Sequence, residues 1–122
     1  AGVYKSGTPY RPSFKGTLTL ASQGTSKTIA MVRLPKGAIP VNLRISSDTS
    51  LGAAKIAIGN ASVANKYRDS AVFTTTNQPV EFMKPGAMSV LAADEEVLVS
   101  NDATAAFPAS GTVTLEVDAI IP

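Results

Sequence analysis

LPKGAIPVNLRISS (residues 34–47) contains a Pro-Lys-Gly corner and then the clearest strand pattern in the chain. Apolar side chains occupy every second position from Ile39 to Ile45, which is the period at which a β-strand buries one face. Pro40 cannot donate a backbone hydrogen bond, so this strand should lie at a sheet edge or enter its sheet at that point. We therefore expect a fold built from β-sheets.

Short segments with a similar apolar alternation lie on both sides of this strand. Turn-forming residues separate them about every 8–12 residues, the spacing typical of an antiparallel sandwich or barrel. The further strands are expected at residues 17–21, 27–34, 53–59, 71–76, 79–83, 96–100 and 112–121. We predict a hairpin between the first two of these segments. The 122 residues suffice for a single core, so the chain is predicted to be one all-β domain, an antiparallel β-sandwich.

The segment NASVANKYR (residues 60–68) is the one place where a short helix is expected. Asn60 would cap this helix, and Val63 would face Tyr67 one turn later. The predicted fold therefore contains at most one short helix.

Residues 1–15 lack strand periodicity and are predicted to form an extended N-terminal arm ahead of a sandwich domain over residues 16–122. The arm interleaves rings with cations and has no acidic residue. Its predicted partner-binding residues are Tyr4, Lys5, Tyr10, Arg11, Phe14 and Lys15. We expect the rings to anchor on a neighbouring protein while the cations select that surface by its charge. The alternative is that the arm covers the open end of its own sandwich.

Charge is divided unevenly along the chain, although the net charge is only +2. Residues 1–47 hold seven Lys or Arg and no acid, whereas residues 48–122 hold four basic and nine acidic residues. Such a split indicates either an acidic partner for the basic part or two parts that interleave in space and neutralise each other.

The chain contains no cysteine and no histidine, which excludes most catalytic and metal-binding chemistry. Disulfides, thiolate nucleophiles and Ser-His-Asp triads are all impossible. The remaining candidate is Asp94-Glu95-Glu96, since carboxylates serve glycoside hydrolysis and calcium binding. Adjacent strand residues point to opposite faces, so we expect these three to be a solvated charge cluster. No catalytic, cofactor-binding or metal-binding residue is predicted, and the protein is not expected to be an enzyme.

Nucleic acid and membranes are two other classes of partner for a chain with a basic, aromatic segment. Cations interleaved with aromatic rings are also what single-stranded nucleic-acid binders use. The acidic remainder of the chain would repel a polyanion, so nucleic acid is not the expected partner. A membrane is not expected either, because the sequence contains no run of 18 apolar residues. A signal peptide is likewise not expected, since the N-terminal residues contain neither a hydrophobic h-region nor a small-residue cleavage site.

Part of the sequence resembles small structural proteins of tailed-bacteriophage virions. The resemblance lies in LPKGAIPVNLRISSDTSLGAAKIAIGN (residues 34–60), with its Leu-Pro-x-Gly corner, alternating strand, polar turn around Asp48 and Leu51-Gly52, and final Ile-Gly. The closing GTVTLEVDAIIP (residues 111–122) resembles the last strand of the same kind of protein. Together these segments cover about a third of the chain.

This resemblance implies a jelly-roll-like β-sandwich that binds and stabilises a capsid as a decoration, or cement, protein. It transfers no functional residues, because in such proteins the function is the interface. The implied partners are copies of the same chain, most simply in a trimer, and the major capsid protein, with no small-molecule substrate. The implied location is the virion, after assembly in the host cytoplasm. A neck or tail structural protein, or a β-sandwich module binding nucleic acid or glycan, is the alternative.

Overall fold

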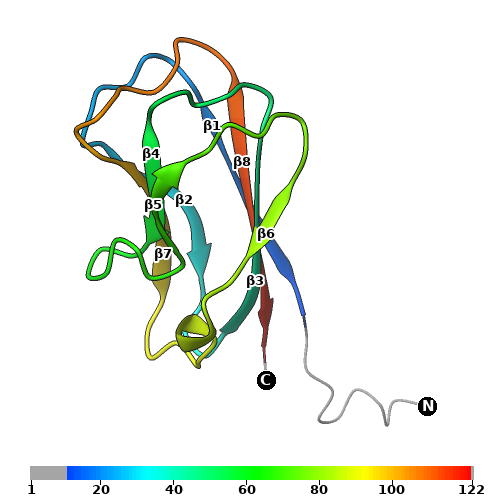
Figure 1. The fold of residues 1–122 in the computed structure, drawn as a ribbon. Coiled ribbons are helices and arrows are strands. Elements are labelled where there is room, and N and C mark those ends of the chain that lie inside the picture. The colour runs from blue at the N-terminus through cyan, green and yellow to red at the C-terminus, as the bar shows by residue number, and fades with distance from the viewer. Residues whose placement is uncertain (1–10, 122) are drawn as a thin grey trace, which may run out of the picture.

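The computed structural model of the protein describes residues 11–121, which form eight β-strands in two four-stranded sheets (Figure 1). A short 3-10 helix follows the sixth strand at Pro85–Ala87. The strands are β1 (Ser13–Thr19), β2 (Thr28–Leu34), β3 (Ile39–Ser47), β4 (Lys55–Gly59), β5 (Arg68–Val72), β6 (Val80–Phe82), β7 (Glu95–Asn101) and β8 (Thr112–Ile120). Among the described residues, no helix is long and apolar enough to cross a membrane.

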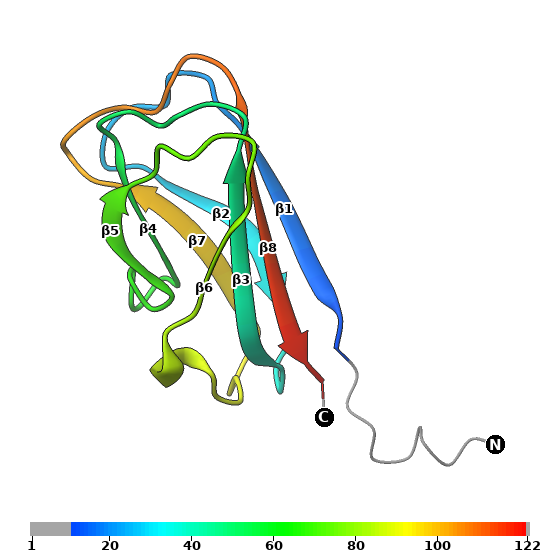
Figure 2. The same ribbon diagram turned by 45° about the vertical axis from the view of Figure 1, so that its right-hand side comes forward.

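The two sheets have the strand orders β1-β8-β3-β6 and β2-β7-β4-β5, and every pairing is antiparallel (Figure 2). Apart from β4 and β5, each strand is followed in the chain by one in the other sheet, which is the winding of a jelly roll. The predicted antiparallel, jelly-roll-like β-sandwich is therefore confirmed. The predicted hairpin is wrong, because β1 pairs with β8 while β2 pairs with β7.

Strand β3 shows how a local irregularity changes which side chains are buried. Leu43 and Ile45 face the core as the alternation predicts. A bulge between Pro40 and Asn42 shifts the register against β8, so Pro40 is buried and Val41 is only half-buried. Strand β6 does not extend as far as Pro40, which therefore lies where the strand enters the sheet.

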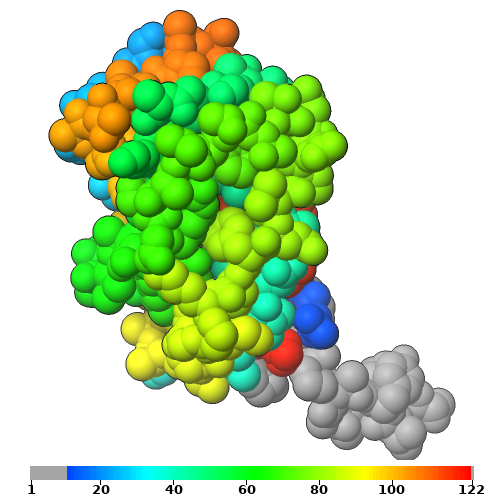
Figure 3. All heavy atoms as spheres, in the orientation of Figure 1, coloured from blue at the N-terminus to red at the C-terminus, as the bar shows by residue number. Residues whose placement is uncertain are grey.

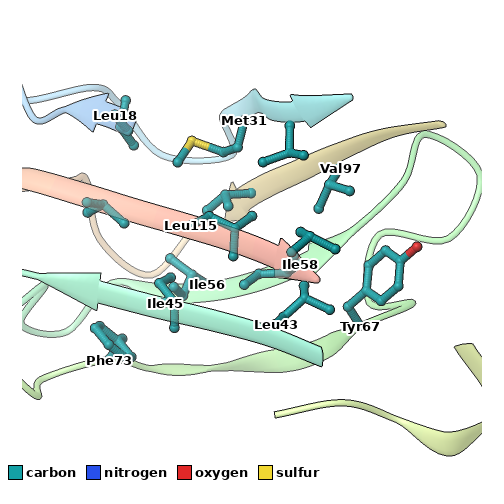
Figure 4. Packing of buried hydrophobic residues seen from close by; sticks show 14 of the residues in the cluster. Leu18, Met31, Leu43, Ile45, Ile56, Ile58, Tyr67, Phe73, Val97 and Leu115 are labelled. Atoms are coloured by element: carbon teal, nitrogen blue, oxygen red, sulfur yellow. The ribbon is translucent and has the colours of Figure 1, made fainter. Parts of the chain in front are cut away.

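The core lies between the two sheets and is almost wholly apolar (Figure 4). Its largest fully buried side chains come from five strands and from the residue that precedes β5; they are Tyr67, Leu34, Leu43, Ile45, Ile56, Ile58 and Leu115, with Val97, Val99, Val113 and Val117. Each residue of this kind contributes roughly 1.5–3 kcal/mol through burial of its side chain. The sandwich is held together mainly by this layer.

Gly16 marks the closest approach between the sheets at the β1 edge. Strand β2 has a bulge between Ala30 and Val32, and the backbone of Met31 projects toward β1 at that point. A Cβ atom placed on Gly16 would lie 1.8 Å from the carbonyl oxygen of Met31, far inside van der Waals contact. This position therefore requires a residue without a side chain.

The expected helix over residues 60–68 is not formed, and this prediction is wrong. Asn60 does act as a local cap, since its Oδ1 accepts hydrogen bonds from the backbone N–H groups of Ser62 and Val63. The chain then turns, because the amide of Tyr67 donates to the carbonyl of Ile58 and draws Tyr67 into the core. Residues 60–66 therefore form a loop, the 60–66 loop, that returns the chain from β4 to β5.

Candidate functional site

The root of the predicted arm is joined to the last strand of the sandwich. The carbonyl of Pro12 accepts a hydrogen bond from the amide of Ala119 at 3.1 Å, and Ser13 pairs with Asp118 at the start of β1. Phe14 lies within β1, partly buried, and packs against the core, whereas Lys15 is exposed. The predicted boundary at residue 15 therefore falls inside a strand.

Of the remaining predicted partner-binding residues, only Arg11 lies in the part of the chain that the structure describes. Arg11 is exposed just ahead of β1. Tyr4, Lys5 and Tyr10 lie outside the described residues. The structure thus brings Arg11 and Lys15 to the start of β1 and turns the ring of Phe14 toward its own core.

Four charged residues form a row across the outer face of the β1-β8-β3-β6 sheet. The strand registers place Lys15 beside Glu116, Glu116 beside Arg44, and Arg44 beside Glu81. Their signs alternate from strand to strand, an arrangement in which each cross-strand neighbour attracts the next. We call these four residues the charged row; it lies on the half of the sheet from which the arm departs.

Arg44 is the centre of this row. Its guanidinium donates to Asp118 at 2.6 and 3.0 Å and to Glu116 at 3.5 Å, and it lies 3.7 Å from Glu81. The hydrogen bonds from Arg44 hold the pKa of Asp118 below its ordinary value, with further help from Ser13 and the charge of Arg11. The bond to Asp118 likewise raises the pKa of Arg44. One cation thus neutralises carboxylates on β6 and β8.

We expect Arg44→Met to lower the free energy of unfolding by about 1–2 kcal/mol at pH 7, because Asp118 and Glu116 would lose their cation. A carboxylate with a lowered pKa stabilises the fold above its unfolded-state pKa, and this contribution disappears as the pH falls through its folded-state pKa. The difference between variant and wild type in urea unfolding should therefore shrink between pH 7 and about pH 3. Lys15→Met is the control from the same row and should change stability by less than about 0.5 kcal/mol. A pH-independent difference for Arg44→Met would contradict the electrostatic explanation.

The uneven charge along the sequence is neutralised in part inside the folded chain. Four of the six ion pairs among the described residues join Arg33 or Arg44 of the basic part to carboxylates of the acidic part. For these two arginines, the basic and acidic parts of the chain therefore interleave in space and neutralise each other. The other described cations of the basic part take part in none of these six pairs.

The carboxylates of Asp94, Glu95 and Glu96 do not converge on a common point. Asp94 accepts from the backbone N–H of Lys36 at 2.8 Å and from Arg33, and these bonds lower its pKa. Glu95 turns into the end of the sandwich, and Glu96 points outward opposite Arg33. Within residues 11–121, no group of three or more acidic side chains is arranged to hold a metal ion. The three carboxylates of this segment thus have different surroundings.

A surface groove of about 530 Å³ lies between the 60–66 loop and residues 89–96. Figure 3 shows these two segments adjoining at one end of the molecule, in green and yellow. The groove is lined by small and polar side chains, and the Val90 side chain is 61% exposed at its rim. Its lining combines Arg33 and Lys66 with Asp94, Glu95 and Glu96, so it has no strong preference for one sign of charge.

Glu95 is the centre of a buried polar cluster at the inner wall of this groove. It accepts hydrogen bonds from Asn60 at 2.8 Å, from Lys66 at 2.7 Å and from the hydroxyl of Tyr67. Burial alone raises the pKa of Glu95, but the three donors outweigh it and hold the pKa below its ordinary value. Burial and the carboxylate raise the pKa of Tyr67, which therefore remains a donor. No pattern in the sequence indicates this cluster beyond the cap-forming Asn60, because its members meet only through the fold.

Comparison with known proteins bears on the fold as a whole. No protein-family model matches the sequence, and no curated protein matches it. Among solved structures, a chain of the cyanophage Pam1 capsid is similar with a TM-score of 0.78 and 19% identity, over 93% of this chain and 86% of that one. A chain of the capsid of Ralstonia phage GP4 is similar with a TM-score of 0.75 and 16% identity, over 93% and 85%.

A third structure, the acid-stable capsid of Helicobacter pylori bacteriophage KHP30, contains a chain with a TM-score of 0.62 and 13% identity, with 94% of each chain covered. At these identities the likeness is one of fold. The jelly roll described above is thus a fold that this chain shares, over nearly its whole length, with chains from the capsid structures of three bacteriophages.

Proposed function

We propose that the protein is a structural component of a bacteriophage virion that binds and stabilises the capsid as a decoration, or cement, protein. The observation that carries this proposal is the likeness of fold to chains of phage capsid structures, which extends over more than nine-tenths of this chain. The carboxylates of Asp94 and Glu95 accept hydrogen bonds from different donors, and Glu96 points outward.

The proposed mode of action is protein–protein contact through the N-terminal arm. In this mode Tyr4 and Tyr10 supply the anchoring rings, and Lys5 and Arg11, each next to one of them in the sequence, supply positive charge. Aromatic anchors contribute most of the affinity at such interfaces, while charge sets the encounter rate and register. Phe14 and Lys15 belong to the root of the arm, where β8 holds it in place. The proposed partners are sister subunits, in a trimer, and the major capsid protein.

Removing residues 1–11 tests this proposal without damaging β1. The deletion keeps Pro12, whose carbonyl bonds Ala119, and keeps all of β1. We expect a variant with unchanged thermal unfolding that no longer assembles in light scattering, or no longer co-sediments with capsids of the phage that encodes it. A Tyr4→Ala/Tyr10→Ala variant should reproduce most of this loss, because it removes the anchoring rings alone.

Ser6→Ala/Thr8→Ala is the matched control, since it changes the same segment without touching a ring or a charge. This control should assemble and bind like the wild type. Unchanged mass and unchanged capsid binding after deletion of residues 1–11 would refute the role of the arm.

A further inference from the structure

Three side chains from one short stretch of chain converge on the carboxylate of Glu95. Asn60 and Lys66 bracket the 60–66 loop, and Tyr67 follows it; Glu95 is at the start of β7. The side chains of Glu95 and Lys66 are only 10% and 21% exposed. Figure 4 shows the Tyr67 ring at the end of the apolar core, with its hydroxyl pointing away from the labelled apolar side chains. The carboxylate thus lies at the boundary between the core and the groove.

The nitrogen atoms of Asn60 and Lys66 share a single acceptor. The amide Nδ2 of Asn60 donates to Oε1 of Glu95 at 2.8 Å, and Nζ of Lys66 donates to the same oxygen at 2.7 Å. The two nitrogens therefore lie on the same carboxylate oxygen, each within hydrogen-bond distance of it. The Lys66 ammonium also lies 5.1 Å from the centre of the Tyr67 ring, a cation–π contact that restrains this side chain.

The amide group of Asn60 is polarised from its other side as well. Its carbonyl oxygen accepts the backbone N–H of Ser62 at 3.0 Å and that of Val63 at 2.6 Å. Two fixed backbone donors on one carbonyl oxygen are the arrangement that stabilises the oxyanion formed when a nucleophile adds to a carbonyl. The cap geometry of the 60–66 loop thus also prepares Asn60 for attack at Cγ.

We propose that Lys66 and Asn60 form a self-catalysed amide cross-link, with Glu95 as the proton carrier. Lysine is a recognised nucleophile once it is neutral, and an adjacent base activates it. The cluster supplies all the required groups: a nucleophile, a polarised carbonyl, an oxyanion site and a carboxylate that touches both the attacking and the leaving nitrogen.

The chemistry balances without an added reagent. Glu95 takes a proton from the Lys66 ammonium, and the Nζ lone pair adds to Cγ of Asn60 while the negative charge moves to Oδ1. Glu95 returns that proton to Nδ2, the bond between Cγ and Nδ2 breaks, and the second surplus proton of Nζ leaves with the departing nitrogen. The products are an amide between Nζ and Cγ, one ammonium ion and the regenerated Glu95 carboxylate.

The positions of these groups favour proton transfer between Lys66 and Glu95 over exchange of that proton with solvent. The Lys66 and Glu95 side chains are held largely out of water, so the proton passes between fixed partners. The hydroxyl of Tyr67 bonds the other oxygen of Glu95 and leaves Oε1 for the two nitrogens. The reaction occurs once per molecule, so it is a modification of the chain and not an enzymatic activity toward a substrate.

Mass spectrometry of the purified protein, kept at pH 8 until its mass is constant, tests the proposal. We expect an intact mass below that of the sequence by one ammonia molecule, about 17 Da. Trypsin should then fail to cleave after Lys66, because the enzyme requires a free lysine, and should release residues 56–68 as one peptide carrying the mass deficit. A succinimide at Asn60 would lose the same mass but leave that cleavage intact, and that result would overturn the proposal.

Variants separate the proposed roles. Glu95→Gln and Lys66→Arg should have the full sequence mass and normal cleavage, provided that circular dichroism shows each to be folded. Asn65→Ala removes a neighbouring side-chain amide that donates to Asp69 and not to Glu95. This variant should show the same mass deficit as the wild type. A wild-type protein with its full mass, or a deficit that persists in Lys66→Arg, would refute the cross-link.

Discussion

Gly16→Ala should destabilise the protein by about 3 kcal/mol or more, and much of the variant should be unfolded or insoluble when expressed. The new methyl group would lie 1.8 Å from the carbonyl oxygen of Met31 and 2.6 Å from its carbonyl carbon. Both are backbone atoms in the bulge of β2, which pairing with β7 holds in place. No side-chain rotation can relieve the clash, so the sheets must move apart at this edge.

The free energy of unfolding in urea measures this effect, and Gly86→Ala provides the matched control. Nothing lies within 4 Å of a Cβ atom at Gly86, so the same chemical change there should alter stability by less than about 0.5 kcal/mol. If Gly16→Ala unfolded at the urea concentration of the wild type, the close approach of β1 and β2 would be disproved.

Leu115→Ala is the second substitution expected to have a large effect, with a loss of about 2–5 kcal/mol. Leu115 is fully buried in β8 (Figure 4). The strand registers place it between Gly16 on β1 and Ile45 on β3. Because Gly16 has no side chain, the neighbouring strand cannot supply atoms to fill the cavity that the truncation leaves. We therefore expect a cost toward the upper end of that range.

Two controls separate loss of packing from a general disturbance of β8. Leu115→Met keeps nearly the same volume and should cost less than about 1.5 kcal/mol. Thr114→Ala changes the adjacent residue on the outer face and should stay within about 0.5 kcal/mol. In thermal and urea unfolding, the loss of stability should be largest for Leu115→Ala, smaller for Leu115→Met and smallest for Thr114→Ala. Equal losses for Leu115→Ala and Thr114→Ala would contradict the assignment of the core face.

Strands in which buried apolar residues alternate regularly with polar ones could be predicted from the sequence. Residues 112–119 alternate without interruption, and their apolar positions are the buried ones. The Pro-Lys-Gly corner could also be predicted. In the structure, Gly37 has a φ of 88° and the amide of Ala38 donates to the carbonyl of Pro35. These features depend on local chemistry, which a single sequence contains.

Features that arise from contacts between distant strands could not be predicted in the same way. The bulge that buries Pro40 depends on the register against β8, about 80 residues later in the chain. The loop at 60–66 has helix-forming residues, but Gly59 packs against the carbonyls of Val63 and Ala64 and the chain must turn there. The cause is pairing with a distant strand in the first case and a close backbone contact within the same loop in the second.

The candidate sites show the same division. The composition of the arm was visible in the sequence, whereas the charged row joins residues 15, 44, 81 and 116 through three pairings of non-consecutive strands. The cluster around Glu95 likewise unites a loop after β4 with the start of β7. Neither grouping has a sequence motif, because each is created by the winding of the jelly roll.

The sandwich has two unlike ends, and this polarity bears on how foreign peptides could be presented on it. Strand β1 begins and β8 finishes at one end, whereas the segments 20–27 and 102–111 cap the other (Figure 1). A tag joined after β8 would emerge beside Pro12 and Ser13, at the root of the segment for which we propose a partner. An epitope inserted at the exposed pair Ala103-Thr104 would instead project from the far end, which makes that loop the better position for display.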